Sequence, residues 1–515
     1  MSDDRIKRLA REQRTAYLSH KKAPDDRPLR PYPLHKPHRR RRMLGAGVVL
    51  ALLIVVFGGI TIADRIVDPV VPLEGAPDAP GPAWDRRVTL DDTDPAGDGR
   101  GMPNAAALWS GGDGTAVLAS PAGVAAHDIA EGEEAWSFTP EGGHLCAAAE
   151  KAAGDDGGTG VVVVGREEAA DEDEGGSGDG TIGPRIVCDT VVALDLESGE
   201  ERWRFTPSDI GDAEDLGPGA VHIWADGART VAAWGPFTVG IDAGSGEELW
   251  SAPELDLPEE ACAFTPSAFS ADGQGGAALL GECGSDSTRR LTTVLDTGTG
   301  ETSRTRALPS ASGVVGPHYT LVSADPVAVL SSPGLDLLPE DDEPQDELFT
   351  ADGDDWRITR TAGESGFGPA KSEWSLDSDT TFATRDGVLY ATPGGTGGWA
   401  RVVALDLATG RTLWDRRLSV RDLHITGFSG DRLLAAAAIE GDEDEGEDAE
   451  VTTRLLDLPT DGEGPAQVLA ADLPELPSPA SSGGPWAVAV GGGYAVGTAP
   501  RDPDRDGSVF VVAAH

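Results

Sequence analysis

The stretch VVALDLESGEERWRF, residues 191–205, contains the pattern that decides the fold. It recurs as VAAHDIAEGEEAWSF at 124–138, TVGIDAGSGEELWSA at 238–252 and VVALDLATGRTLWDR at 402–416. In every copy a Gly follows an Asp by four positions and a Trp follows it by eight: Asp128, Gly132 and Trp136; Asp195, Gly199 and Trp203; Asp242, Gly246 and Trp250; Asp406, Gly410 and Trp414. This fixed spacing indicates an internal structural repeat.

Each copy predicts a β-hairpin. A run rich in β-branched residues ends at the Asp, whose carboxylate can bond turn amides, and the Gly supplies a residue with positive φ. The second run ends in a Trp, whose large apolar face suits packing of one sheet on the next. A row of Trp side chains used as a ligand platform is the alternative, and we favour packing between sheets.

Weaker copies fill the rest of the chain. They are Asp296 and Gly300, with Arg304 in place of Trp; Asp352, Gly353 and Trp356 within 348–359; and a copy centred on Asp457 within 452–470. The steps between consecutive Asp residues are mostly about 50 residues, the length of a four-stranded sheet unit. Units of this size arranged radially form a β-propeller, so we expect an all-β fold.

The two ends of the chain predict how the ring closes. Residues 486–490, 494–498 and 508–513 read as three strands, one short of a full unit. The missing strand is expected at 84–90, because WDRRVTL there nearly repeats WDRRLSV at 414–420. Pairing 84–90 with the last strand removes an exposed sheet edge and brings the expected number of blades to eight.

The extended pattern Ala-x-Asp-x-x-[ST]-Gly-x-x-x-Trp, seen at 193–203 and 404–414, resembles the repeat of the pyrroloquinoline-quinone-like (PQQ-like) β-propellers. The resemblance covers residues 84–515. It implies the propeller fold but no single activity, since the family includes quinone-dependent dehydrogenases and non-enzymatic scaffolds.

The resemblance also implies what a quinoprotein would need. Its dehydrogenases have a disulfide between adjacent cysteines above the cofactor, and an acidic residue and an amide that hold calcium. No two cysteines are adjacent here, and Asn104 is the only asparagine. We therefore expect a cofactor-free relative that does not bind PQQ and is not an enzyme, with a PQQ-dependent oxidoreductase as the alternative.

The N-terminal region predicts a membrane anchor. Residues 44–63 are twenty without a charge, enough to span a bilayer as a helix, and four arginines precede them at 39–42. Residues 1–42 hold 14 Lys and Arg against 5 Asp and Glu. The positive-inside rule then places the N-terminus in the cytoplasm and the remainder outside.

These features predict four segments: a disordered basic cytoplasmic tail (1–43), a single transmembrane helix (44–63), a Pro-rich linker (64–83) and an extracytoplasmic propeller (84–515). A cleaved signal peptide is the alternative for the apolar run. The long basic region and the length of the run favour retention as a signal-anchor.

All four cysteines follow the apolar run, on the side where disulfides persist. We expect two bridges, Cys146 with Cys188 and Cys262 with Cys283, each between neighbouring strands of one blade. A cysteine metal site would need a spacing such as CxxC, which is absent.

One segment resembles the first half of a calcium loop. Asp502, Asp504 and Asp506 stand at alternate positions before Gly507, as in loops whose carboxylates converge on a hard cation. The position of the final bidentate Glu is occupied by Ala513. An acidic hairpin turn is therefore the interpretation we prefer, with calcium as the alternative.

Charge limits the choice of partners. The chain has a formal net charge of −47, and the basic residues concentrate in the first 42 positions. Nucleic acid is excluded as a partner of the acidic part, because binding phosphates requires Lys and Arg. We expect a non-catalytic binding or scaffold module for a protein, cell-wall or small-molecule partner, with a sensor ectodomain as a further alternative.

Overall fold

The chain divides into two units, Met1–Ile66 and Val67–His515, and the residues that the computed structural model describes all lie in the second. The described ranges are 73–74, 82–89, 107–112, 114–141, 144–154, 157–168, 185–208, 210, 221–257, 264–271, 274–283, 289–308, 318–332, 347–353, 355–361, 382–392, 400–420, 423–440, 451–473, 482–490, 493–500 and 508–514. Every regular element within these ranges is a β-strand, which confirms the all-β prediction.

The strands form eight sheets. The first four, called blades 1 to 4, are β3–β6 (Ala107–Ser110, Thr115–Ser120, Gly123–Asp128, Glu134–Phe138), β7–β10 (His144–Ala148, Thr159–Glu168, Arg185–Asp195, Glu201–Phe205), β11–β14 (Val221–Asp226, Arg229–Trp234, Phe237–Asp242, Glu248–Ala252) and β15–β18 (Phe264–Ala271, Gly276–Cys283, Arg289–Asp296, Thr302–Ala307).

Blades 5 to 7 are β19–β22 (His318–Ala324, Val327–Ser332, Glu347–Asp352, Asp355–Thr361), β23–β26 (Phe382–Arg385, Val388–Ala391, Ala400–Asp406, Thr412–Leu418) and β27–β30 (Leu423–Ser429, Arg432–Glu440, Val451–Pro459, Ala466–Leu473). Each of the first seven sheets thus contains four consecutive strands. The eighth, blade 8, combines β31–β33 (Ser482–Val490, Gly493–Pro500, Ser508–Ala514) with β2 (Pro82–Thr89).

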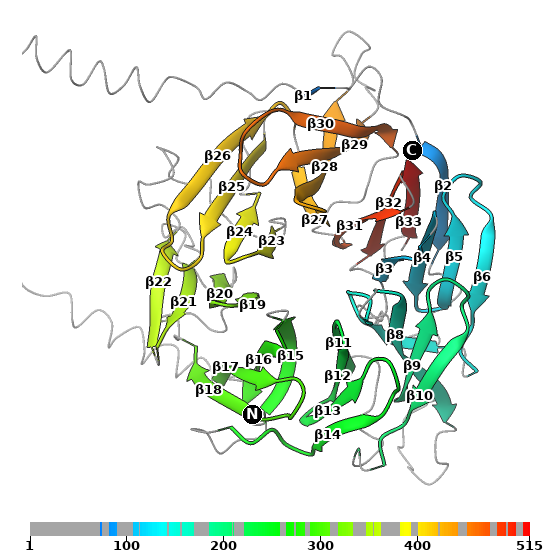
Figure 1. Cartoon of the computed structure of the whole chain (residues 1–515), viewed down its shortest axis with the longest axis vertical. Helices are drawn as coiled ribbons and strands as arrows, with labels where there is room; N and C mark the ends of the chain where they lie inside the picture. Colours follow the sequence, from blue (N-terminus) through cyan, green and yellow to red (C-terminus); the bar gives the residue numbers. More distant parts are fainter. Residues whose placement is uncertain are drawn as a thin grey trace, which may run out of the picture. The chain divides into compact units, whose positions relative to one another are not determined.

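The blades are arranged around a ring, which makes the fold a β-propeller (Figure 1). The first strand of a blade contacts the first strand of the next: β7 meets β11, and the series continues through β15, β19, β23, β27 and β31. Strand β31 in turn contacts β3, and a shared apolar core joins blades 1 and 2. The propeller prediction is confirmed.

The expected fold class also included a transmembrane helix, and this part is corrected. Among the described residues no helix is long and apolar enough to cross a membrane. The apolar run at 44–63 and the basic tail lie outside the described residues.

The predicted closure of the ring is confirmed. Strand β2 pairs antiparallel with β33, with Arg86 opposite Val511 and Thr89 opposite Ser508. The preceding segment contributes a further strand that the sequence did not suggest. Leu73–Glu74 (β1) pairs in parallel with Ala466 and Gln467 of β30, so part of the expected linker is the fifth strand of blade 7.

The repeat hairpins form as predicted, and Asp195 shows the role of the repeat Asp. Its Oδ1 accepts hydrogen bonds from the amides of Glu197 (3.0 Å) and Ser198 (2.9 Å). The amide of Gly199, at φ 74°, donates to the Asp195 carbonyl at 2.8 Å. The Asp therefore holds the turn, and only a residue that tolerates positive φ closes it without strain.

The repeat Trp docks on the turn of the following blade. The indole of Trp203 lies against Gly246, where an added Cβ would be 2.7 Å from the ring, and its Nε1 donates to the Ala243 carbonyl at 2.8 Å. Trp250 and Trp414 dock in the same way, with Nε1 donating to the carbonyls of Thr297 (2.9 Å) and Thr460 (2.8 Å). The structure therefore places these Trp side chains between blades.

The weaker copies depart from this scheme in different ways. Arg304 has φ 53°, and the contact with the next blade comes from Arg306, whose guanidinium donates to the Gly353 carbonyl. Trp356 donates backward, to the Ala307 carbonyl of the preceding blade at 2.8 Å. The copy centred on Asp457 was misplaced: Asp457 is buried in β29 and pairs with Arg432, and the turn follows at 460–465.

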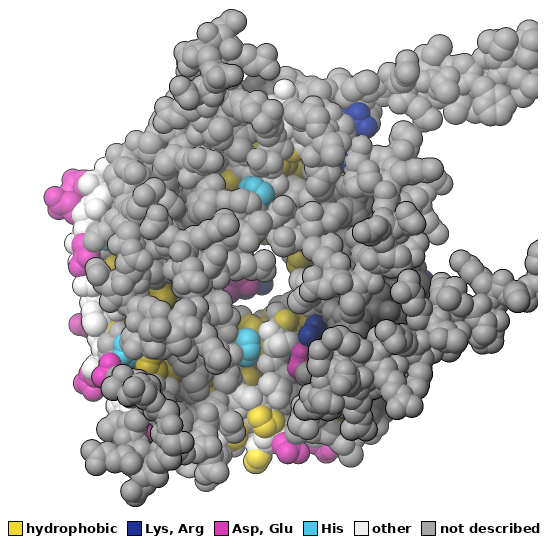
Figure 2. Space-filling view, turned by 180° about the vertical axis from the view of Figure 1, so that it is seen from behind, with side chains coloured by type: hydrophobic (Ala, Val, Ile, Leu, Met, Phe, Trp, Pro, Cys, Tyr) yellow, Lys and Arg dark blue, Asp and Glu magenta, His cyan; other side chains and the backbone are white. Residues whose placement is uncertain are grey.

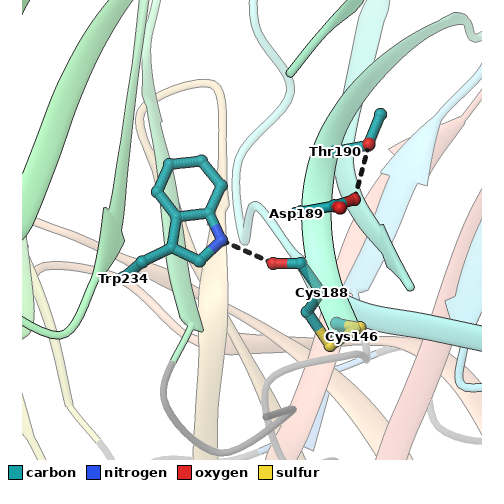
Figure 3. The surroundings of a disulfide bond; sticks show 5 residues. All are labelled: Cys146, Cys188, Asp189, Thr190 and Trp234. Atoms are coloured by element: carbon teal, nitrogen blue, oxygen red, sulfur yellow. Dashed lines mark hydrogen bonds between the residues drawn. A yellow bond between two sulfur atoms is a disulfide. The ribbon is translucent and has the colours of Figure 1, made fainter. Parts of the chain in front are cut away.

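The Cys146–Cys188 disulfide is present, with Cα atoms 6.0 Å apart (Figure 3). It does not join neighbouring strands as expected: Cys146 is in β7 and Cys188 in β9, and β8 runs between them. Cys146 and Asp189 each fall at a register shift, where an extra residue bends the strand. Cys283 is also disulfide-bonded, and its expected partner Cys262 lies outside the described residues.

Gly165 of β8 lets the bridge pass over the middle strand. A Cβ at this position would lie 2.7 Å from Cys146 Sγ and 2.7 Å from Ile186 Cγ2, closer than real Cβ atoms come. We expect Gly165→Ala to lower the free energy of unfolding by about 1–3 kcal/mol, the usual range for overpacking, as measured by urea denaturation. The loss should shrink when Cys146→Ala is also present; an equal loss in both backgrounds would contradict this role.

Candidate functional site

Two turns of the same blade lie side by side on one face of the ring, as blades 2 and 4 show. In an antiparallel four-stranded blade, the turn between strands one and two and the turn between strands three and four fall at the same end. The structure joins them directly: the amide of Leu196 donates to the Gly158 carbonyl (3.0 Å), and that of Thr297 to the Gly275 carbonyl (2.9 Å). We call the face that carries these turns the turn face.

Among the described residues, two pockets open on the turn face, each between two blades. The larger, about 580 Å³, lies between blades 1 and 2 and is called the 1/2 pocket. Its walls include Trp109 and Gly112 of blade 1 and Gly157, Leu196 and Arg202 of blade 2. Gly112 and Gly157 have positive φ and no atom where a Cβ would stand, so small turn residues help to leave the space open.

Two of the charged residues that line the 1/2 pocket, Asp195 and Arg202, pair with each other within blade 2. Arg202 Nη2 lies 2.6 Å from Asp195 Oδ2, and Arg202 Nη1 donates to Thr159 Oγ1 at 2.7 Å. The hydrogen bond from Arg202, together with those from Ser198, lowers the pKa of Asp195 to about 2. Asp195 is therefore ionised at neutral pH and holds Arg202 as well as its own turn.

The second pocket, about 460 Å³, lies between blades 6 and 7 and is called the 6/7 pocket. Blade 6 contributes the β23–β24 hairpin, and blade 7 contributes two turns. The lining residues are Arg385, Asp386, Val388, Tyr390, Gly430, Asp431 and Thr460. Both carboxylates sit in hairpin turns, where Asp is favoured because it tolerates tight backbone geometry.

Packed aromatic rings form the base of the 6/7 pocket, on the side away from its opening. Tyr390, 6% exposed, lies 5.9 Å from the ring of Trp414 and 5.6 Å from that of Phe428 between centroids. Burial raises the pKa of Tyr390, and its hydroxyl donates to the Thr460 carbonyl at 3.5 Å. The pocket thus has a base of packed aromatic rings and polar side chains in its walls.

Arg385 is held at the rim of the 6/7 pocket. Its guanidinium carbon lies 4.0 Å from the centroid of the Phe428 ring, and its Nη1 donates to the Gly430 carbonyl. A cation over an aromatic face is attracted by the ring quadrupole. Arg385 is therefore a structural contact between blades 6 and 7 as well as a lining residue.

A third group of aromatic side chains lies between blades 3 and 4. His222 stacks on Trp224 with centroids 5.6 Å apart, and Trp224 stacks on Phe269 at 5.3 Å. Burial lowers the pKa of His222. The side chains come from the first strands of their blades, β11 and β15, which lie nearest the middle of the ring in Figure 1. Figure 2 shows the ring from the opposite side, with its centre hollowed.

The sequence-predicted site residues have different outcomes. The repeat Asp, Gly and Trp residues hold turns and blade contacts. Asp502, Asp504 and Asp506 lie outside the described residues, so calcium binding there stays a prediction. Sequence reasoning missed Arg385, Tyr390 and Thr460, because they belong to no repeat position that the pattern marks.

No known family and no curated protein matches the chain. Among solved structures, one titled "Crystal structure of the eukaryotic initiation factor" is similar with a TM-score of 0.38 and 10% identity, over 78% of this chain and 84% of that one. Another, titled "Crystal Structure of Mitotic Checkpoint Complex", has a TM-score of 0.35 and 10% identity, over 86% of this chain and 96% of that one. The class that the fold and the site define is a β-propeller with interblade pockets on its turn face.

Proposed function

We propose that this chain is a non-catalytic binding module that holds a protein partner on the turn face of its propeller. The observation that carries the proposal is that the repeat residues and the pocket-lining residues have separate roles. The repeat Asp, Gly and Trp are used in turns and blade contacts, and polar groups from neighbouring blades meet in the 1/2 and 6/7 pockets. Propellers bind partners through turns and loops held by a rigid core.

We further propose that the module works on the outer side of the cytoplasmic membrane and without a quinone cofactor. The location is supported by the four arginines at 39–42, the uncharged run at 44–63 and the acidic remainder of the chain. Dye reduction with alcohols after addition of PQQ and calcium would instead identify an oxidoreductase.

Site-specific photo-crosslinking in intact cells tests the binding proposal. A photoreactive amino acid at Asp431, in the 6/7 pocket, is expected to give a discrete crosslinked protein band. The matched control is Leu413, which is 54% exposed on the outer strand of blade 6 and away from the pocket lining. Equal crosslinking at both positions, or none at Asp431, would refute a partner on this part of the turn face.

A further inference from the structure

An arginine of the chain itself shows what fits between two blades on the turn face. Arg229, the first residue of β12, reaches from blade 3 to blade 4. Its Nη1 donates to Thr297 Oγ1 at 2.9 Å and to the Gly275 carbonyl at 3.4 Å. These two acceptors form a seat for a guanidinium group.

The same acceptors recur between blades 6 and 7. Thr460 Oγ1 donates to the Asp431 carbonyl at 2.7 Å, as Thr297 Oγ1 does to the Gly275 carbonyl at 2.9 Å. The Thr460 carbonyl accepts from Trp414 Nε1, as the Thr297 carbonyl does from Trp250 Nε1. The threonine hydroxyl that donates in this bond still has lone pairs to accept a further one. Blade 7 therefore presents the equivalent seat.

The residue that would fill this second seat is too short. Arg229 pairs with Asp242, the last residue of β13, and the residue paired with Asp406, the last of β25, is Val388. Val388 lines the 6/7 pocket, and its side chain has no polar atom. The 460 Å³ pocket between blades 6 and 7 thus lies at the position equivalent to the one that the Arg229 guanidinium occupies between blades 3 and 4.

Two carboxylates give the 6/7 pocket negative charge. Asp431 stands where blade 4 has Gly275, and Asp386 faces the same pocket from blade 6. The ion pairs of the described residues include neither carboxylate. Arg385 adds a positive charge, which is engaged with the Phe428 ring and the Gly430 carbonyl. A planar cation with several N–H donors suits this set of acceptors.

We propose that the 6/7 pocket binds the guanidinium group of an arginine side chain supplied by the partner protein. This inference rests on the proposed function and names the chemical group that the site takes. The acidic charge of the chain, −47 overall, favours the approach of a basic segment. The 1/2 pocket does not share the assignment, because Leu196 stands there in place of Thr297 and offers no hydroxyl.

Calorimetric titration of the full-length chain with Nα-acetyl-L-arginine methylamide tests the proposal, with the citrulline analogue as the neutral control of the same shape. We expect saturable binding of the arginine probe, and binding of the citrulline probe weaker by about tenfold or more, as for loss of a charge-assisted hydrogen bond. Equal binding of the two probes, or no saturable heat with arginine, would overturn the assignment.

A variant that fills the 6/7 pocket with its own side chain tests whether the arginine probe binds there. Val388→Arg should seat its own guanidinium as Arg229 does, keep the fold and weaken arginine binding by at least about tenfold. Thr115→Arg, at the equivalent position beside the 1/2 pocket, should leave the affinity unchanged. Unchanged binding in the Val388→Arg variant would place the arginine elsewhere and refute the inference. Crosslinking at Asp431 without arginine binding would refute only the arginine assignment and leave the proposed function standing.

Discussion

Replacing Trp203 by alanine is expected to lower the free energy of unfolding by about 3–5 kcal/mol, the range for removing a large buried aromatic side chain. Trp203 is 8% exposed and packs on Gly246 of the next blade. The substitution removes this contact and the hydrogen bond to the Ala243 carbonyl together. Urea denaturation followed by Trp fluorescence or circular dichroism measures the loss.

Two variants separate the parts of this effect. Trp203→Phe keeps most of the apolar contact and loses only the Nε1 hydrogen bond, so about 1 kcal/mol is expected. Leu249→Ala changes an outer-strand residue that is 42% exposed, and its effect should stay within about 0.5 kcal/mol. A Trp203→Ala effect as small as that of Leu249→Ala would contradict interblade docking.

The local part of the repeat could be predicted from sequence because its chemistry is local. Asp195, its turn amides and Gly199 lie within five consecutive positions, so spacing alone predicts their geometry. The target of the Trp could not be predicted in this way. The acceptor of Trp203 is 40 residues away, and Trp356 selects the preceding blade instead of the following one.

The misplaced copy at Asp457 has a physical reason. In the regular copies the turn Gly donates its amide to the carbonyl of a residue four positions earlier, as Gly410 does to Asp406. In blade 7 the amide of Gly462 donates to the Pro459 carbonyl, three positions earlier. The turn is thus one residue shorter and has no repeat Asp, so a search for Asp selected a buried ion-pair residue nearby.

The Cys146–Cys188 pairing was predicted correctly, but its path across β8 and the 6/7 pocket could not be predicted from the sequence. The bridge crosses β8 because of register shifts at Cys146 and Asp189, and such bulges leave no clear pattern in the sequence. The pocket exists because Val388 is short where Arg229 is long, a difference that has meaning only once the blades are aligned.

Deleting residues 82–89 is expected to cost the largest share of stability. The deletion removes β2 from blade 8 and leaves β33 without its outer partner, along seven residue pairs. With about one ladder hydrogen bond per pair and about 0.5–1.5 kcal/mol each, the loss is roughly 4–10 kcal/mol. The exposed edge of β33 should also promote association of the truncated chain. A synthetic peptide with the sequence of residues 82–89, added in excess, should restore part of the stability.

Amide hydrogen exchange of β33 in the full chain and in the deletion variant tests most directly whether the N-terminal strand seals the ring. Residues 508–514 should be protected in the full chain, lose most of that protection in the variant, and regain it when the peptide is added. Equal protection of 508–514 with and without residues 82–89 would contradict a propeller closed by this strand.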